Sequence, residues 1–482
     1  MMKMAHFNLG KFSQIMILIV LFLCSSIYET CHARESKQWN QRKNVYMIKE
    51  KDYYDGVNRH PRHHHGRSLS NFKGSDYIWS DEKGQNVQNV ATFNVLDYGA
   101  KGDGHTDDTQ AFEAVWEAAC KVEASTIIVP SPSIFLLHPI SFSGPNCADN
   151  IVFQLDGKII APTSATPWGS GLLQWIDFTK LKGITVQGKG VIDGQGSVWW
   201  NDLSSYSPYS EITGELRTKM PGTKPTALRF YGSSGVTVTG ITIQNSPQTH
   251  LKFDDCTTVQ VSDFTAASPE NSPNTDGIHL QHSRDVLIFS TDLSCGDDCI
   301  SIQTGCSNVY IHNINCGPGH GISIGGLGKD NTQACVSNVT VRDIQMQNTL
   351  TGVRIKTWQG GSGSVQGVTF SNIQVSGVET PIMIDQFYCD GGNCRNESSA
   401  VAISGINYVN IKGTYTRNPL HLACSDNLPC TGLSLDTIEL ESAGEDSQPF
   451  CWNTYGDLRG ATVPPVNCLG TGKSRKPDVV NC

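Results

Sequence analysis

The chain has 482 residues, a net charge of −9, a charged fraction of 17% and 47 glycines. Glycine exceeds its usual share of about 7%, whereas charged residues fall below their usual share of about 25%. The apolar fraction of 38% and the small net charge exclude a largely disordered chain and a strongly basic nucleic-acid binder. Many glycines and few charges favour a turn-rich β architecture over a helical one.

The first 33 residues have the pattern of a secretory signal. Lys3 and Lys11 precede an apolar run from Ile15 to Cys24, and a small-residue cleavage site lies at 31–33. The apolar run is too short to cross a bilayer, which takes about 20 residues. We therefore expect a cleaved signal and a secreted protein, in the extracellular space or the cell wall, without membrane attachment.

Residues 34–90 differ in composition from the rest of the chain. Residues 34–73 carry ten Lys and Arg, four Asp and Glu, and four His, three of which stand together at 63–65. Such a segment is typical of a flexible basic extension or a removable propeptide. Binding of a metal ion by the histidines, or of an anionic wall polymer by the basic residues, remains open. The chain from residue 74 onward is distinctly acidic, with a net charge of −16.

Cysteines in a secreted chain are expected to form disulfides. Fifteen of the 17 cysteines lie beyond the signal, so we expect bridges with one thiol left over. Cys389 with Cys394, and Cys424 with Cys430, are spaced as local loop bridges. The spacings do not form two CxxC knuckles, so no zinc site is predicted.

One amphipathic helix is predicted near the start of the remaining chain. Residues 106–109 offer capping side chains, and apolar residues then recur at spacings of three and four over residues 111–119. An apparent strand and turn over residues 93–100 precede it. A lone helix before a long β region suits a cap on the open end of a solenoid, so residues 91–482 are predicted to form one domain.

Short strands of alternating pattern repeat through the middle of the chain. They are centred on six valines, at 236, 259, 286, 309, 339 and 368. The separations of 23, 27, 23, 30 and 29 residues, without helices between the strands, predict an all-β parallel β-helix. A β-sandwich is the competing interpretation, but it needs antiparallel hairpins that a near-fixed period disfavours.

Acidic residues repeat in phase with these strands. Asp276, Asp298 and His320 begin similar segments and are 22 residues apart. Equivalent residues of adjacent coils lie about 4.8 Å apart, so these three side chains should stack, with Asp297 beside them. Asn308 is compatible with a ladder at a corner.

This column has the chemistry of a glycosidic-bond hydrolase. That reaction needs one protonated carboxyl for the leaving oxygen and one carboxylate to activate water or attack carbon. Neighbouring aspartates repel one another when ionised, which raises at least one pKa. Arg354 and Lys356, farther along the same face, are suited to hold a substrate carboxylate, so an anionic sugar is expected. Asn274 is assigned to the site by its place beside Asp276.

Four segments resemble, in order and spacing, the signature motifs of the polygalacturonases, which are pectin-cleaving glycoside hydrolases. The segments are NTDG (274–277), GDDC (296–299), GHG (319–321) and RIK (354–356). The resemblance extends over roughly residues 93–470, and the flanking sequence is most similar to the plant members. It implies a right-handed parallel β-helix over the catalytic domain that hydrolyses α-1,4-linked galacturonan with inversion, without a metal or organic cofactor.

The same resemblance implies the role of each catalytic residue. Asp297 would be the general acid, and Asp276 and Asp298 would activate water. His320 would help to maintain the protonation of the acid. Inverting enzymes usually separate their carboxyls by about 6.5–9.5 Å, whereas adjacent coils suggest a closer approach, so inversion rests on the resemblance.

The substrate-binding residues are implied by the same comparison of motifs. Arg354 and Lys356 would bind galacturonate, and Tyr388 would line the cleft. A Cys299–Cys316 bridge beside the site is also implied. Gly326 departs from the family, which often has serine there.

Two other functions remain open on the sequence. A pectate lyase on a similar β-helix would eliminate rather than hydrolyse, and a non-catalytic pectin-binding protein would not need the acidic column. Asn338 and Asn396 head N-glycosylation triplets. We expect a monomer whose partner is pectin or polygalacturonate, without a nucleic-acid partner. Endo and exo action are not distinguished.

Overall fold

The computed structural model describes residues 91–200, 220–390, 394, 396–444 and 446–471. The predicted signal (1–33) and the predicted basic extension (34–90) lie outside the described residues and stay predictions. Short helical elements in the described part are η1 (Val95–Tyr98), α3 (Thr109–Ala119), η2 (Thr166–Trp168), α4 (Ser197–Trp200) and η4 (Lys329–Asn331). None of the helices in this part has the length and apolar character that a membrane crossing requires.

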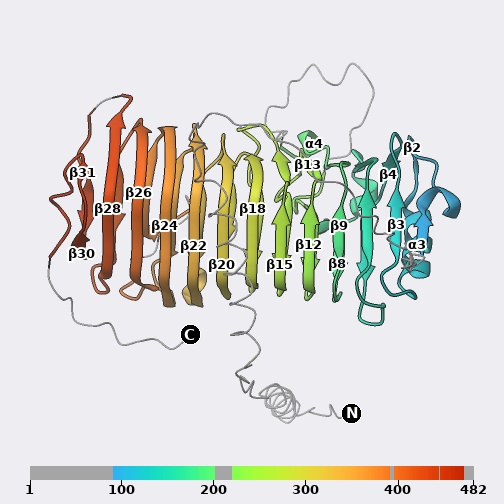
Figure 1. Cartoon of the computed structure of the whole chain (residues 1–482), viewed down its shortest axis with the longest axis horizontal. Coiled ribbons are helices and arrows are strands. Elements are labelled where there is room, and N and C mark those ends of the chain that lie inside the picture. The colour runs from blue at the N-terminus through green and yellow to red at the C-terminus, as the bar shows by residue number, and fades with distance from the viewer. Residues whose placement is uncertain (1–90, 201–219, 391–393, 395, 445, 472–482) are drawn as a thin grey trace, which may run out of the picture. The chain divides into compact units, whose positions relative to one another are not determined.

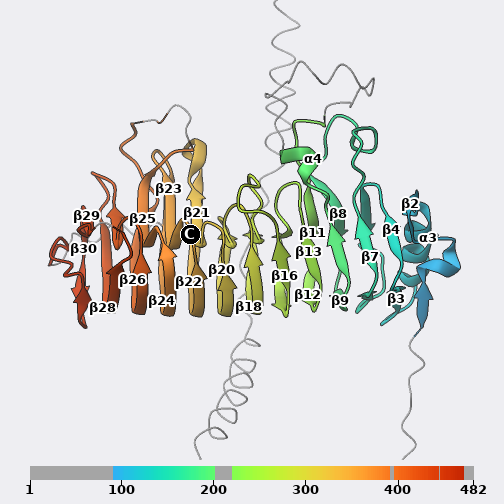
Figure 2. The same cartoon turned by 90° about the horizontal axis from the view of Figure 1, so that it is seen from above.

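Successive coils of the chain build two long sheets, which lie as separate layers along the same axis (Figures 1 and 2). The eleven-stranded sheet contains β5 (Ile140–Ser143), β8 (Gln174–Thr179), β11 (Thr226–Tyr231), β14 (Leu251–Asp254), β17 (Ile278–Gln281), β19 (Ile300–Ile302), β21 (Ile322–Leu327), β23 (Thr351–Trp358), β25 (Thr380–Tyr388), β27 (Leu420–Ala423) and β29 (Phe450–Trp452).

The twenty-stranded sheet contains, in its first half, β1 (Thr92–Asn94), β2 (Asp103–Asp107), β3 (Thr126–Val129), β4 (Ile134–Leu136), β6 (Val152–Leu155), β7 (Lys158–Ile160), β9 (Thr185–Gln187), β10 (Val191–Asp193), β12 (Ser234–Thr239) and β13 (Thr242–Gln244). Its second half contains β15 (Thr257–Ser262), β16 (Thr265–Ala267), β18 (Arg284–Ser294), β20 (Cys306–Cys316), β22 (Gln333–Gln347), β24 (Ser362–Val378), β26 (Ala402–Tyr415), β28 (Cys430–Ser442), β30 (Thr454–Leu458) and β31 (Thr462–Val463).

The predicted valine repeat forms one inward-facing ladder of the twenty-stranded sheet. All six valines pair in register from coil to coil, and each is at most 2% exposed. The strand pairings are parallel throughout the described part of the chain, which excludes the β-sandwich alternative. The prediction of an all-β, right-handed parallel β-helix is therefore confirmed, with the hand that parallel crossovers adopt.

Helix α3 lies at the amino-terminal end of the coils, as predicted for a cap (Figure 1). Phe112 and Trp116 are buried against the core rings Phe135 and Phe142. The capping side chains differ in detail from the prediction, because Asp108 accepts the backbone N–H groups of residues 101 and 102 instead of a helical N–H. The backbone N–H groups of residues 101 and 102 thus supply the hydrogen bonds that the buried Asp108 carboxylate needs.

Disulfides close several loops of the described chain. Cys389–Cys394, Cys424–Cys430 and Cys299–Cys316 are formed as expected. Cys120–Cys147 and Cys451–Cys468 are formed in addition. Three buried cysteines, rather than one, are free among the described residues, namely Cys256, Cys295 and Cys306.

Side-chain amides form ladders where the coils turn. Asn308 donates to Asp285 at 2.8 Å and accepts from Asn338 at 2.7 Å. All three residues have a left-handed φ between 54° and 57°, a conformation that Asn and Asp tolerate better than most residues. The corner role expected for Asn308 is present, and the amide of the glycosylation candidate Asn338 belongs to the same ladder.

Candidate active site

Three neighbouring strands of the eleven-stranded sheet, β17, β19 and β21, carry the predicted column just before their first residues. The first residues of these strands pair with one another in register. Two positions earlier in consecutive coils stand Asp276, Asp298 and His320. The expected stacking of these residues, about 4.8 Å from coil to coil, is therefore found.

The Asp297 carboxyl is held by three groups. His320 Nδ1 lies 2.9 Å from Oδ1, and the Asp298 backbone N–H donates to the same oxygen at 2.9 Å. The Asn274 amide donates to Oδ2 at 3.3 Å. A ring nitrogen and a carboxyl at this distance form a hydrogen bond, and the Asp297 side chain remains 19% exposed. This carboxyl is therefore the member of the column best placed to exchange a proton with a bound molecule.

The Asp298 carboxylate is enclosed by cations. Arg354 Nη2 donates to Oδ1 at 2.6 Å, Lys356 Nζ donates to Oδ2 at 3.0 Å, and Ser323 Oγ donates to Oδ1 at 2.7 Å. Burial alone would raise the pKa of Asp298, but Arg354 and Lys356 together hold it below its usual range. Asp298 is therefore a fixed anion at neutral pH.

The Asp276 carboxyl has fewer hydrogen-bond partners than the other two. His279 Nδ1 lies 3.0 Å from its Oδ2, and both side chains are largely buried. Burial raises the pKa of Asp276, and the negative charges of Asp297 and Asp298 raise it further. One pKa in the column is raised, as expected, and it is that of Asp276, but burial contributes more than repulsion between the aspartates.

A fully buried histidine holds the backbone of Asp276. The backbone N–H of His250 and its ring Nδ1 both lie 2.8 Å from the Asp276 carbonyl oxygen. Burial lowers the pKa of His250 to about 4, so the ring is neutral. A carbonyl only accepts, so Nδ1 carries the proton, and Nε2 accepts from Ser268 Oγ at 2.7 Å.

The two predicted cations also contact residues other than Asp298. Arg354 Nε donates to Ser323 Oγ at 3.0 Å, and Lys356 Nζ lies 5.3 Å from the centroid of the Tyr388 ring. The Tyr388 ring meets Trp358 edge-on at 5.4 Å. All eight predicted site residues thus lie on β17–β25 or in the turns before these strands, with Tyr388 at the edge of the group.

The sequence interpretation missed four residues that position this group. They are His250, His279, Ser323 and Trp358. Only His279 had a usable signal, because it lies three residues after Asp276 in a repeated segment whose other copies have serine, at Ser301 and Ser323.

The departure at Gly326 has a structural consequence. A Cβ at this position would lie 3.1 Å from Trp358 Nε1 and 3.5 Å from a Tyr388 ring carbon. The first of these contacts would be tight for an aliphatic carbon. Glycine therefore leaves room for the Trp358 indole beside Tyr388.

Possible metal ligands come together within the column itself. Ligand atoms of Asp297, Asp298 and His320 lie within 4.8 Å of one another. Arg354 and Lys356 already balance the Asp298 charge at hydrogen-bond distance. The hydrogen-bond donors around Asp298 are therefore those of a carboxylate held by the protein's own cations. The absence of a metal, expected from the sequence, remains a prediction.

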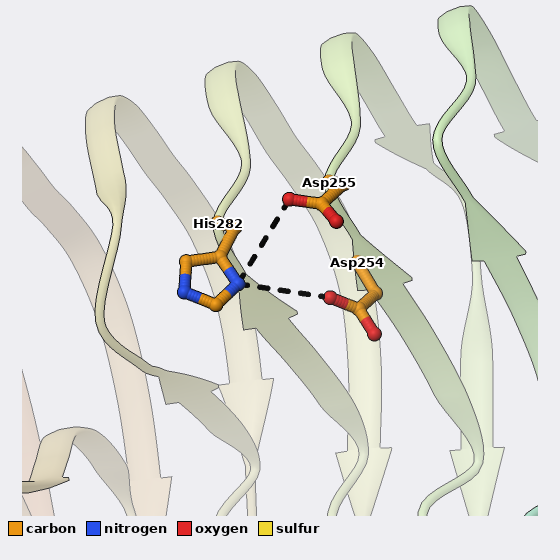
Figure 3. A group of neighbouring side chains, drawn as sticks. All are labelled: Asp254, Asp255 and His282. Atoms are coloured by element: carbon orange, nitrogen blue, oxygen red, sulfur yellow. Dashed lines mark ion pairs between the residues drawn. The ribbon is translucent and has the colours of Figure 1, made fainter. Parts of the chain in front are cut away.

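A second group of possible ligands consists of Asp254, Asp255 and His282 (Figure 3). His282 Nδ1 lies 3.9 Å from an oxygen of each aspartate. The side chains of His282 and Asp255 are 45% and 51% exposed. Long, solvated contacts of this kind are weak ion pairs, and no further feature of the described residues points to a bound cation there.

Sequence comparisons give the relatives of this chain, and a structure comparison gives a protein of similar fold. The profile of Glycosyl hydrolases family 28 matches residues 120–459. A polygalacturonase from Cryptomeria japonica is 39% identical over 390 residues, which cover 80% of this chain and 74% of that protein. Polygalacturonase QRT2 from Arabidopsis thaliana is 36% identical over 458 residues, which cover 94% and 99%. The fold is similar to that of endo-xylogalacturonan hydrolase from Aspergillus tubingensis, with a TM-score of 0.64, 23% identity, and coverage of 77% of this chain and 100% of that chain.

Proposed function

Since the chain belongs to family 28 of the glycosyl hydrolases, we propose that it is a polygalacturonase that hydrolyses the α-1,4 linkages between galacturonate units of pectin. One observation carries this proposal beyond the family. Three aspartates share one site, in which Arg354 and Lys356 fix Asp298 as an anion and His320 forms a hydrogen bond with Asp297.

Asp297 acts as the general acid. Its proton passes to the glycosidic oxygen of the leaving sugar, and its bond to His320 keeps a proton available at this carboxyl. General acid catalysis by a positioned side chain contributes about 10²–10⁴-fold to a rate. The hydrogen bonds from Asn274 and from the Asp298 backbone keep the carboxyl oriented toward the substrate face.

Asp276 and Asp298 activate the attacking water. Asp298 remains ionised and orients the water as an acceptor. Asp276 has a raised pKa, which makes its carboxylate the stronger base and the better acceptor of the water proton. Attack from the face opposite the leaving oxygen gives inversion at the anomeric carbon.

Arg354 and Lys356 select a substrate that carries a carboxylate. The guanidinium uses Nε for Ser323 and Nη2 for Asp298, and its remaining N–H groups donate to no acceptor among the described residues. Those donors suit a sugar carboxylate. Tyr388 lies under the Lys356 ammonium at 5.3 Å and bounds this end of the site.

Product analysis on polygalacturonate tests the proposal. The wild-type protein should release new reducing ends without ultraviolet absorbance, and Asp297→Asn should lower kcat by at least about a hundredfold. Asp457→Asn, an exposed carboxyl on β30, is the matched control and should remain active. An unsaturated, absorbing product would show a lyase, and binding without any product would show a pectin-binding protein.

Secretion to the cell wall and a monomeric state complete the proposal. The apolar run and cleavage pattern of residues 1–33 support secretion, and the single solenoid domain supports the monomeric state.

Product length separates the endo and exo alternatives, because endo cleavage produces intermediate oligomers early and exo cleavage produces only short ones.

A further inference from the structure

The outer face of the eleven-stranded sheet continues beyond the catalytic residues to a pocket on β25, β27 and β29. The pocket has a volume of about 400 Å³. Most of its lining consists of aromatic rings and carboxyl groups, contributed by Asp385, Phe387, His421, Asp426, Phe450 and Trp452. This composition differs from that of the catalytic column, where Arg354 and Lys356 stand beside the aspartates.

Strand register connects the pocket to the substrate-binding cations. Lys356 on β23 pairs with Asp385 on β25, and the same row continues to Trp452 on β29. Strands lie about 4.8 Å apart, so β27 is about 10 Å from β23. A polymer that crosses the strands at the catalytic column and continues in that direction reaches the pocket.

The pocket presents ring faces to a ligand. The His421 and Phe450 rings stack with their centroids 4.8 Å apart, and Phe450 and Trp452 are 44% and 51% exposed. The Trp452 Nε1–H donates to Asp426 Oδ1 at 2.7 Å, which holds the indole in place. Fixed aromatic faces with a few polar groups are typical of ligand pockets and suit the C–H faces of a sugar ring.

The described lining of the pocket offers an anionic sugar no cationic side chain. Its described lining contains two carboxyl groups and neither lysine nor arginine. Burial lowers the pKa of His421, so this ring is neutral near pH 7. Burial raises the pKa of Asp385, and the Arg354 charge acts on this carboxyl in the opposite direction. A galacturonate carboxylate would still find neither lysine nor arginine among the described lining residues to receive it, which disfavours that ligand. Sugar hydroxyls, in contrast, donate well to carboxylates.

We propose that this pocket is a binding subsite for a methyl-esterified galacturonosyl unit, located about two strands beyond the Arg354–Lys356 pair. The ester removes the charge that finds no cation there and adds a methyl group that packs on Trp452 or Phe450. The enzyme therefore favours pectin in which a free acid is followed, farther along the chain, by an ester. This inference rests on the proposed polygalacturonase function and adds a selectivity to it.

Calorimetric binding to the Asp297→Asn protein tests the subsite without turnover. The probes are galacturonide oligomers of equal length, either free acids or methyl esters. Adding Trp452→Ala should weaken ester binding about three- to tenfold, the range for losing one aromatic contact, and should leave free-acid binding unchanged. Trp452→Phe should retain ester binding, and Leu458→Ala, an exposed residue of β30, is the matched control.

A charge change provides the second arm. Asp426→Lys should increase affinity for the free-acid oligomer several-fold and reduce the preference for the ester. Equal losses for both oligomers in Trp452→Ala, or no loss for either, would overturn the subsite. Hydrolysis of polygalacturonate by the wild type is assayed separately, so failure of the proposed function is distinguishable.

Discussion

Asp276 and Asp298 occupy equivalent places in neighbouring coils, yet the chain surrounds their carboxyl groups in opposite ways. Asp298 has the Arg354 and Lys356 cations at 2.6 and 3.0 Å, whereas Asp276 has one ring nitrogen of His279 at 3.0 Å. Burial opposes ionisation of both aspartates, but the cations reverse its effect on the pKa only at Asp298. The coil repeat thus sets the positions of the two carboxyls, and neighbouring strands set their charges.

A cation on the Asp276 side, Lys252, does not remove this difference, because the pKa of Asp276 stays raised. Lys252 pairs in register with His279, and the Asp254 and Asp276 charges favour its ionised form. Burial nevertheless lowers the pKa of Lys252, and the Arg229 charge adds to this effect against the two aspartates. Arg229 itself is held by Asp177 at 2.9 Å. The Asp276 carboxyl therefore remains suited to exchange a proton, whereas the Asp298 carboxylate remains ionised.

The largest expected effect on stability comes from Asp298→Asn. The isosteric amide leaves the Arg354 and Lys356 charges buried without a counter-ion, which typically costs about 3–5 kcal/mol of the free energy of unfolding. Urea denaturation at pH 7 measures the loss. Because the pKa of Asp298 is lowered in the folded state, its contribution is present above about pH 4 and is lost as pH falls from there through the folded-state pKa.

The matched control for this substitution is Asp457→Asn, an exposed carboxyl on β30. Surface changes of this kind usually alter stability by less than about 0.5 kcal/mol. Equal denaturation midpoints for Asp298→Asn and Asp457→Asn would contradict the view that the two cations depend on Asp298.

Asp276→Asn should have a smaller effect of opposite sign. The pKa of Asp276 is raised in the folded state, so its stabilising contribution is present at low pH and lost as pH rises from about 4 through the folded-state pKa. Asparagine does not titrate. The variant should therefore be more stable than the wild type at pH 7, by about 0.5–2 kcal/mol, although it loses activity.

Thermal unfolding at two pH values measures this gain. The difference between Asp276→Asn and the wild type should be large at about pH 7 and should shrink near pH 3, where the wild-type carboxyl is protonated. A destabilised Asp276→Asn at neutral pH, like Asp298→Asn, would show that the two aspartates have equivalent surroundings after all.

The sequence was sufficient to predict the features that repeat. The valine period predicted the inward ladder, and the spacing of 22 residues predicted the stack of Asp276, Asp298 and His320, because one coil imposes one register on every residue of the repeat. The repeat does not specify which side chain reaches across coils. Ser323 joins Arg354 to Asp298 only after folding brings residues 25 and 31 positions away together.

Cysteine pairing shows the same limit. The two short-range bridges were predicted from spacing, whereas the parity of the cysteine count suggested one free thiol and the described residues contain three. An odd number of cysteines requires only that the number of cysteines left unpaired is odd. The folded coils keep Cys256, Cys295 and Cys306 buried without disulfide partners, a pattern that a linear count does not contain.

The smallest expected effect concerns His279, the side chain that supports Asp276. Its hydrogen bond lowers the pKa of Asp276 against the larger effect of burial. His279→Leu removes that bond, so the Asp276 pKa rises further and the acidic limb of the kcat/KM profile on polygalacturonate moves to higher pH. The loss at the pH optimum should be about two- to tenfold, as expected for one hydrogen bond.

The glutamine variant separates positioning from bulk at this residue. His279→Gln retains an N–H donor of similar reach, so the acidic limb should return toward that of the wild type, whereas His279→Leu keeps the limb displaced. A purely structural role would lower kcat/KM equally at every pH in both variants. Since Asp298 has its own cations, the Asp276 side alone should respond, and an unmoved acidic limb in His279→Leu would place the titrating base elsewhere in the column.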